Sequence, residues 1–175
     1  MTVPSELLLE FQEAGRALCD AGLVEANSGN ISARCGDGIV ISRHDATLRH
    51  LQASDLMEVA LEGPADLDAS VELPAHRAVY RMTAAQAIVH AHPPAAIAAS
   101  LELDEVDFPE SKSPVVEGPS ASEALAEAVA SALGESPIVI ARGHGTFAVG
   151  GTLAVACERT LRLEETCRGK LESTR

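Results

Sequence analysis

The sequence predicts a single α/β domain, in which helices and short strands follow one another along 175 residues. Apolar residues at helical spacing recur at both ends of the chain and between strands. Short runs rich in Val and Ile end in polar side chains. The chain is 46% hydrophobic and 22% charged, which is typical of a globular protein with its own core. It contains no internal repeat or linker, so residues 1–175 are expected to form one domain.

Apolar periodicity and turn-forming residues set the expected order of elements. The expected helices are residues 4–21, 70–80, 95–101, 120–133 and 152–170. The expected strands lie in residues 25–34 (after a turn), 39–41, 57–61, 87–92, 137–141 and 146–149. The acidic, proline-containing segment 102–119 is expected to be a mobile surface loop.

Composition excludes several classes of partner. The net charge of −13 opposes binding to nucleic-acid duplexes through phosphate neutralisation, and aromatic residues make up only 2% of the chain. The four cysteines form no CxxC pair, so no zinc ribbon or thioredoxin-type site is indicated. The chain has neither a signal peptide nor an apolar run near the roughly 20 residues of a membrane span. A cytoplasmic protein without membrane partners is therefore expected.

Two histidines end the apolar run at residues 87–89. In a strand, residues i and i+2 point to the same face, so His90 and His92 can direct both imidazoles at one point. Neutral imidazole is the commonest side-chain ligand for zinc and related metals. A His-x-His pair alone is explained at least as well by two histidines that face solvent at a strand end.

Two further residues favour the metal site. His144 follows the apolar run 138–140 in a glycine-flanked turn, and Glu72 opens the segment that leads into the His-x-His strand. Three histidines and a carboxylate are sufficient to hold a catalytic divalent metal and leave room for a substrate.

Small polar residues near the start of the first strand are candidates for substrate binding. Gly29 allows the backbone to approach a ligand closely, and Ser28 and Asn30 can donate hydrogen bonds there. Most clusters of this composition are ordinary loops, so this signal is weak alone.

A second set of candidates lies at the end of strand 39–41. Arg43 and His44 occupy a usual place for ligand-facing side chains, and His44 with Asp45 can form an acid–base pair or a simple polar loop. Ser70 is expected to cap the helix that follows. His76 lies one turn after Glu72 on that helix, and a structural role is favoured over a role as a partner of the metal site.

Four blocks of sequence, taken together, resemble the class II aldolase/adducin family, whose best-known enzymes are similar to L-fuculose-1-phosphate aldolase. The blocks contain the histidines and the glutamate described above, and they span nearly the whole chain. They are residues 27–32, 70–76, 89–93, and 142–145 with Gly150 and a helix that ends in residues 163–165.

The resemblance implies a three-layer α/β/α fold with a central, mostly antiparallel sheet. It also implies a homotetramer with sites at subunit interfaces. Zn²⁺ would be held by His90, His92 and His144, although nitrogen and oxygen ligands also accept other divalent transition metals. Glu72 would be the catalytic acid/base residue. Asn30 and Ser70 fall on positions that hold the substrate phosphate in the aldolases.

The activity implied by the resemblance is that of a metal-dependent aldehyde-lyase. Such an aldolase cleaves a small ketose phosphate, for example L-fuculose 1-phosphate, into a triose phosphate and an aldehyde. The zinc ion acts as a Lewis acid that stabilises the enediolate formed when the carbon–carbon bond breaks. A sugar phosphate or a related keto compound is the expected partner.

The sequence departs from the family pattern around the phosphate. The Thr/Ser-Gly pair of the aldolases is replaced by His44 and Asp45, and the second hydroxyl of a double serine is lost at Val71. Asp45 adds a negative charge near the expected dianion, which Arg43 or His44 can compensate. These changes leave open whether the substrate carries a phosphate.

Three alternatives share this family. A decarboxylase would use the same enediolate. A sugar-phosphate 4-epimerase would need a further acid/base residue, often Asp with Tyr. It ranks lower because the chain's single tyrosine, Tyr80, is expected to serve in packing and no other follows the closing helix. A non-catalytic, adducin-like assembly module is disfavoured because all three histidines are present.

Overall fold

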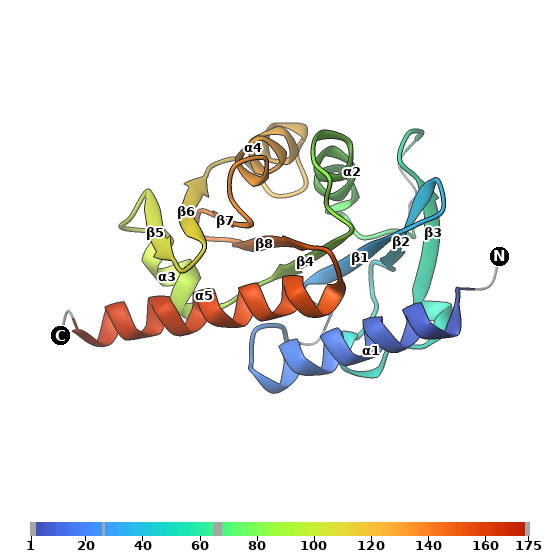
Figure 1. Cartoon of the computed structure of the whole chain (residues 1–175), viewed down its shortest axis with the longest axis horizontal. Coiled ribbons are helices and arrows are strands. Elements are labelled where there is room, and N and C mark those ends of the chain that lie inside the picture. The colour runs from blue at the N-terminus through green and yellow to red at the C-terminus, as the bar shows by residue number, and fades with distance from the viewer. Residues whose placement is uncertain (1–2, 26, 65–67, 174–175) are drawn as a thin grey trace.

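One eight-stranded sheet lies between two layers of helices in the computed structural model, which describes residues 3–25, 27–64 and 68–173 (Figure 1). The strand order is β3-β2-β1-β4-β8-β7-β6-β5, and every neighbouring pair is antiparallel except β6 and β7. This arrangement confirms the predicted α/β/α fold with a mostly antiparallel sheet. The prediction of one domain over residues 1–175 stays a prediction.

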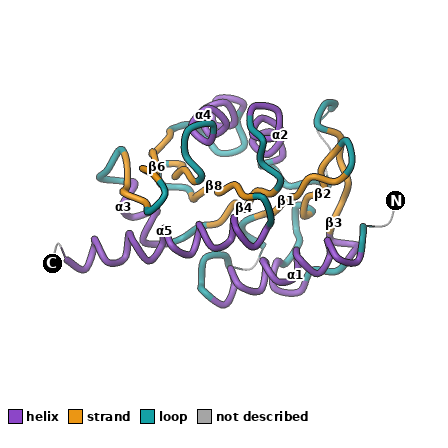
Figure 2. The backbone as a smooth tube through the Cα atoms, in the orientation of Figure 1, coloured by secondary structure: helices purple, strands orange, loops and turns teal. Residues whose placement is uncertain are grey.

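The elements follow the expected order, with most boundaries shifted by one to three residues. The helices are α1 (Ser5–Asp20), α2 (Leu73–Met82), α3 (Pro94–Ser100), α4 (Glu123–Leu133) and α5 (Leu153–Ser173), with short 3-10 turns at Leu48–His50 and Ala53–Asp55. The strands are β1 (Asn30–Cys35), β2 (Gly38–Ser42), β3 (Leu56–Ala60), β4 (Ala87–Ala91), β5 (Glu105–Phe108), β6 (Ser111–Val116), β7 (Ile138–Ala141) and β8 (Gly145–Gly150). Figure 2 shows how loops join these elements at the two ends of the sheet.

Two hydrophobic cores lie on opposite faces of the sheet. Helices α2 and α4 pack against one face, and α1, α3 and α5 against the other (Figure 1). Alternation along β4 explains the division, because Ile88 belongs to the α2/α4 core and Val89 to the opposite core. Each fully buried Ile or Val contributes about 1.5–3 kcal/mol relative to an exposed one. His90 therefore faces the same side as Ile88, toward α2 and α4.

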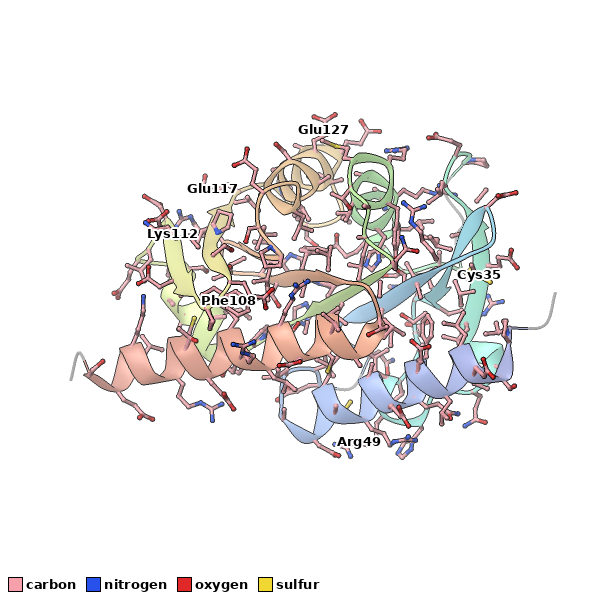
Figure 3. All side chains as sticks on the ribbon, in the orientation of Figure 1. Cys35, Arg49, Phe108, Lys112, Glu117 and Glu127 are labelled. Atoms are coloured by element: carbon pink, nitrogen blue, oxygen red, sulfur yellow. The ribbon has the colours of Figure 1, made fainter. Side chains whose placement is uncertain are left out.

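The prediction of a surface loop at residues 102–119 is wrong, because β5 and β6 form an antiparallel pair there. Burial alternates along β5: Val106 and Phe108 are buried while Glu105 and Asp107 are exposed. Figure 3 shows Phe108 between β5 and α5, where it joins the core that α5 covers. The two-residue alternation of a strand is hard to recognise in this sequence, because its outer face is acidic and only two apolar side chains are buried.

The expected helix at residues 70–80 begins at Leu73, and Ser70 does not cap it as predicted. The Oγ atom of Ser70 accepts a hydrogen bond from the backbone N–H of Glu72 at 3.3 Å, one residue before the first helical turn. Ser122 is the residue that caps α4, because its side chain accepts the Leu125 N–H at 3.1 Å. Ser120, two residues earlier, donates a hydrogen bond to Glu72.

Candidate metal centre

Neighbouring strands bring the three candidate histidines together. His90 is the fourth residue of β4, whose five residues are all buried, and His92 follows two residues later. His144 lies in the turn between β7 and β8, and β8 is the strand that pairs with β4. Each residue offers one ring nitrogen, and the three nitrogens lie within 4.8 Å of one another. The Nε2 atoms of His90 and His92 are 3.1 Å apart, close to the spacing of two nitrogens about 2.0–2.1 Å from one zinc ion.

The surrounding structure fixes the orientation of the His90 ring. Its Nδ1–H donates to the carbonyl oxygen of Thr146 at 3.0 Å, and because a carbonyl can only accept, Nδ1 carries the proton. Nε2 is then left with its lone pair toward His92. On the other side the ring stacks on Phe147, with centroids 4.2 Å apart. Such a backbone partner sets the tautomer that a metal-ligating histidine needs.

Electrostatics favour the neutral, metal-binding form of the His90 and His92 rings. Burial lowers the pKa of His90 well below its ordinary value, and the neighbouring His92 and His144 rings lower it further. Burial also lowers the pKa of His92, with a second contribution from His144. At these two rings, protons therefore compete with a metal only at a pH below the usual range of histidine.

Two features fit a metal between the rings. The Nδ1 atom of His144 is buried and has no hydrogen-bond partner among the described residues, which is costly for a nitrogen without a ligand. A Cβ atom at Gly145 would lie 2.7 Å from Cδ2 of His92 and 3.2 Å from Cε1 of His90. Because Gly145 has no side chain, the His90 and His92 rings have room to converge beside it.

Substituting Gly145 with alanine tests this close approach. The added Cβ would also lie 2.4 Å from the backbone oxygen of Ala91, so neither the sheet nor the rings can keep their places. Zinc affinity, measured by competition with a chromophoric chelator, is expected to fall about tenfold or more. Stability is expected to fall by roughly 1–3 kcal/mol. Gly151→Ala is the control, because no atom lies within 4 Å of its Cβ. Wild-type zinc affinity in a folded Gly145→Ala protein would refute the packing argument.

The carboxylate of Glu72 lies at the edge of the histidine cluster. The residue is only 3% exposed, and its Oε1 atom is 3.8 Å from Nε2 of His144. Oε1 also accepts hydrogen bonds from the Ser120 hydroxyl at 2.8 Å and the Ala121 N–H at 3.3 Å. Ala121 has a φ of 58°, which costs a residue with a Cβ roughly 1–2 kcal/mol and directs its N–H at Glu72. The loop before α4 thus holds this carboxylate beside the three rings.

A second buried carboxylate supports the strand end that carries His92. Oε2 of Glu164, on α5, accepts the N–H groups of Ala95 and Ala96 at 2.9 and 3.1 Å. These are donors of the first turn of α3, which starts two residues after His92. The backbone N–H of His92 itself donates to Leu23 at 2.8 Å. Glu164 therefore fixes the loop between His92 and α3.

The substitution Glu164→Gln is expected to lower the free energy of unfolding by roughly 1–3 kcal/mol. The amide keeps the volume, but it loses the charge that two N–H groups and Arg168 share. Denaturant unfolding measures the change, and the exposed neighbour Glu165→Gln serves as the control. Equal stability of both variants would mean that the α3 contact contributes little.

The structure also locates Asn30, Ser70 and Ser28. Asn30 is opposite His90 in the β1–β4 register, so both side chains lie on one face of the sheet. Ser70 is 6% exposed and two residues from Glu72. Ser28 closes the turn before β1, where its Oγ accepts the Glu25 N–H at 2.8 Å. Asn30 and Ser70 therefore lie next to residues of the cluster, whereas Ser28 has a local structural bond.

Arg43 and His44 are engaged in their own loop. The Arg43 guanidinium donates to Asp68 at 3.2 Å and to the Ser54 carbonyl at 2.9 Å. The His44 ring lies 3.9 Å from the carboxylate of Asp45, and both side chains are more than half exposed. Arg43 bridges to Ala69, so this loop runs beside the residue before Ser70. The charge of Asp45 is in contact with solvent, which weakens its repulsion of an anion.

Ser70 also lines a cavity of about 710 Å³ between α2 and α4. Val71, Arg77, Ala121 and Glu127 are among its walls, and Figure 3 shows Glu127 on the outer side of α4. None of the three histidines lines it, whereas Ser70 and Ala121, which both bond to Glu72, do.

Sequence reasoning missed the partners that hold the acidic groups. Ser120 and Ala121 meet Glu72 across 48 and 49 residues of chain, and no local pattern marks such a contact. Glu164 carried a signal, because it lies four residues after Thr160 on the buried stripe of α5. A carboxylate on an apolar stripe needs a partner inside the protein.

Comparison with known proteins agrees with this fold. The sequence model of the family described as "Class II Aldolase and Adducin N-terminal domain" matches residues 9–171. The structure of an L-fuculose-1-phosphate aldolase from Thermus thermophilus is similar, with a TM-score of 0.92 and 37% sequence identity; the match covers 98% of this chain and 96% of the other.

Two curated relatives have other activities. A methylthioribulose-1-phosphate dehydratase from Acidiphilium cryptum (strain JF-5) is 34% identical over 81% of this chain and 78% of its own length. A 3,4-dihydroxyphthalate decarboxylase from Arthrobacter keyseri is 29% identical over 86% of this chain and 72% of its own.

Fold, site and sequence together define an enzyme of the class II aldolase superfamily, a group that is generally metal-dependent. This chain belongs to the class II aldolase and adducin family. Among the helices of the described ranges, none is long and apolar enough to cross a membrane.

Proposed function

We propose that the protein is a metal-dependent lyase that cleaves a small ketose phosphate, such as L-fuculose 1-phosphate, into a triose phosphate and an aldehyde. One observation carries the proposal: three converging histidine nitrogens lie beside a buried carboxylate, with Asn30 and Ser70 next to them. The 37% identity with an L-fuculose-1-phosphate aldolase over nearly the full length of both chains supports this choice of substrate.

His90, His92 and His144 hold the metal in this proposal, and zinc fits their borderline-soft nitrogen ligands. When bound, the metal supplies a Lewis acid for the negative charge that develops on a carbonyl oxygen of the substrate. Glu72 transfers the proton, because its carboxylate is buried at the edge of the cluster, directly before the first residue of α2. Asn30 and Ser70 bind the anionic end of the substrate.

Product analysis on one set of substrates tests the proposal. The zinc-loaded protein is incubated with L-fuculose 1-phosphate, and triose phosphate release is followed by a coupled dehydrogenase. Release that requires both metal and Glu72 is the expected result. Absence of release with this and other ketose 1-phosphates, from protein that binds metal, would exclude the aldolase.

Decarboxylation and dehydration are the second candidates, because curated relatives carry these activities. Both reactions build negative charge beside a carbonyl group, so they need the same three histidines. They are separated from the aldolase by product: carbon dioxide from a 3-keto acid, or loss of water from methylthioribulose 1-phosphate. The aldolases have a hydroxyl at the position of Val71. Its absence favours an anion-binding subsite that differs from theirs, and therefore these second candidates.

The proposed assembly is a homotetramer with sites at subunit interfaces, as the family resemblance implies. Light scattering is expected to give a mass four times the 18.2 kDa of one chain. A monomer that retains full activity would contradict shared sites.

A further inference from the structure

A row of buried polar groups lies behind Asn30. The ring of His76, on α2, is fully buried; its Nε2 atom is 2.6 Å from Oδ1 of Asn30 and its Nδ1 atom is 2.6 Å from Oγ of Ser32. The same Oγ atom is 2.9 Å from the hydroxyl of Tyr80. Asn30 and Ser32 are two residues apart on β1, so both face α2.

The contacts determine which way each hydrogen bond runs. With Oδ1 of Asn30 as acceptor, Nε2 of His76 carries the proton, and Nδ1 accepts the hydroxyl of Ser32. The oxygen of Ser32 then accepts the hydroxyl of Tyr80, and every group is satisfied. The reverse direction leaves the Tyr80 hydroxyl hydrogen without an acceptor among the described residues, in a side chain that is only 2% exposed. An unsatisfied buried donor costs about 1–3 kcal/mol, which favours the first direction.

Burial supports these protonation states. It lowers the pKa of His76 to about 3, so the ring is neutral and has a single N–H. It raises the pKa of Tyr80, so the hydroxyl keeps the proton that it donates. The Oδ1 atom of Asn30 therefore has its donor in His76, which leaves the Nδ2 atom as the end of the carboxamide that can donate to a ligand.

We infer that His76 is a positioning residue, held by Ser32 and Tyr80, that fixes the Asn30 carboxamide with its NH₂ group turned away from the core. Asn30 is opposite the metal ligand candidate His90, so the two donors are available beside the cluster. This subsite binds an oxygen atom that can accept hydrogen bonds, such as a phosphate or carboxylate oxygen. It disfavours a hydroxyl group that needs an acceptor for its own hydrogen. The substrate part of this inference rests on the proposed function.

The tautomer of His76 can be measured without any substrate. The zinc-loaded protein, labelled with ¹⁵N-histidine, is examined by long-range ¹H–¹⁵N NMR at pH 7, and the His76 signals are assigned by their loss in His76→Gln. A ring protonated at Nε2 only is the expected result. A ring protonated at Nδ1 would overturn the inference, whether or not the protein cleaves ketose phosphates.

Kinetics then test the effect on binding. His76→Phe keeps a ring but removes both nitrogens, and it is expected to raise KM for the cleaved ketose phosphate about tenfold or more, with a small change in kcat. His76→Gln, whose amide nitrogen reaches the position of Nε2, is expected to restore KM. Ser32→Ala is the milder variant if His76→Phe does not fold, and it should raise KM in the same way. An unchanged KM in folded Ser32→Ala and His76→Phe, or a loss confined to kcat, would refute the positioning role.

Discussion

Replacing His90 with alanine is expected to abolish binding of the transition metal and all turnover. The substitution removes a ligand whose tautomer is set by Thr146 and whose ring stacks on Phe147, so no neighbouring group can substitute for it. Loss of an outer-shell partner costs metal sites roughly 10–100-fold in affinity, and loss of a ligand is expected to exceed that range. Equilibrium dialysis against buffered zinc measures the change.

His50→Ala is the matched control for this variant. His50 is exposed in the 3-10 turn Leu48–His50 and belongs to no cluster of metal-binding groups in the described ranges. It is expected to bind one zinc per chain, the result that we also expect of the wild type. Zinc retention by folded His90→Ala would show that the ion binds elsewhere.

Replacing Glu72 with glutamine is expected to leave metal binding intact and to reduce kcat by roughly 10²–10⁴-fold, the usual contribution of a general acid or base. The amide has nearly the same shape and can still accept from Ser120, so the local structure is expected to persist. Only the ability to take up a proton is lost. Steady-state kinetics on the zinc-loaded variant measure the effect.

Glu127→Gln, on the exposed side of α4, provides a control with the same change of charge. It should keep wild-type kcat. A metal-replete Glu72→Gln protein with kcat near that of Glu127→Gln would remove the acid/base assignment.

The main parts of the fold and the cluster follow from local sequence rules. The i, i+2 rule places His90 and His92 on one face of β4, and the turn between two apolar runs brings His144 to the adjacent strand. Apolar periodicity together with proline, capping and turn-forming residues predicts all five helices, and each of them packs against the sheet. The resemblance to a family adds the mostly antiparallel character of the sheet, which periodicity alone does not contain.

The remainder depends on contacts between distant parts of the chain. Periodicity does not show that Ser120 meets Glu72, or that His76 turns its ring toward Asn30 instead of the glutamate one turn earlier. The strand that contains Val106 and Phe108 is not recognised from the sequence, because its outer face is acidic and it is only four residues long. Such features are set by the packing of helices on the sheet.

Metal titration of activity tests the central claim most directly. Metal-free protein is supplied with zinc in steps, and triose phosphate release from L-fuculose 1-phosphate is measured at each step. The expected rate rises in proportion to zinc and levels off at one ion per chain. A rate that is the same in metal-free and zinc-loaded protein would contradict a metal-dependent lyase.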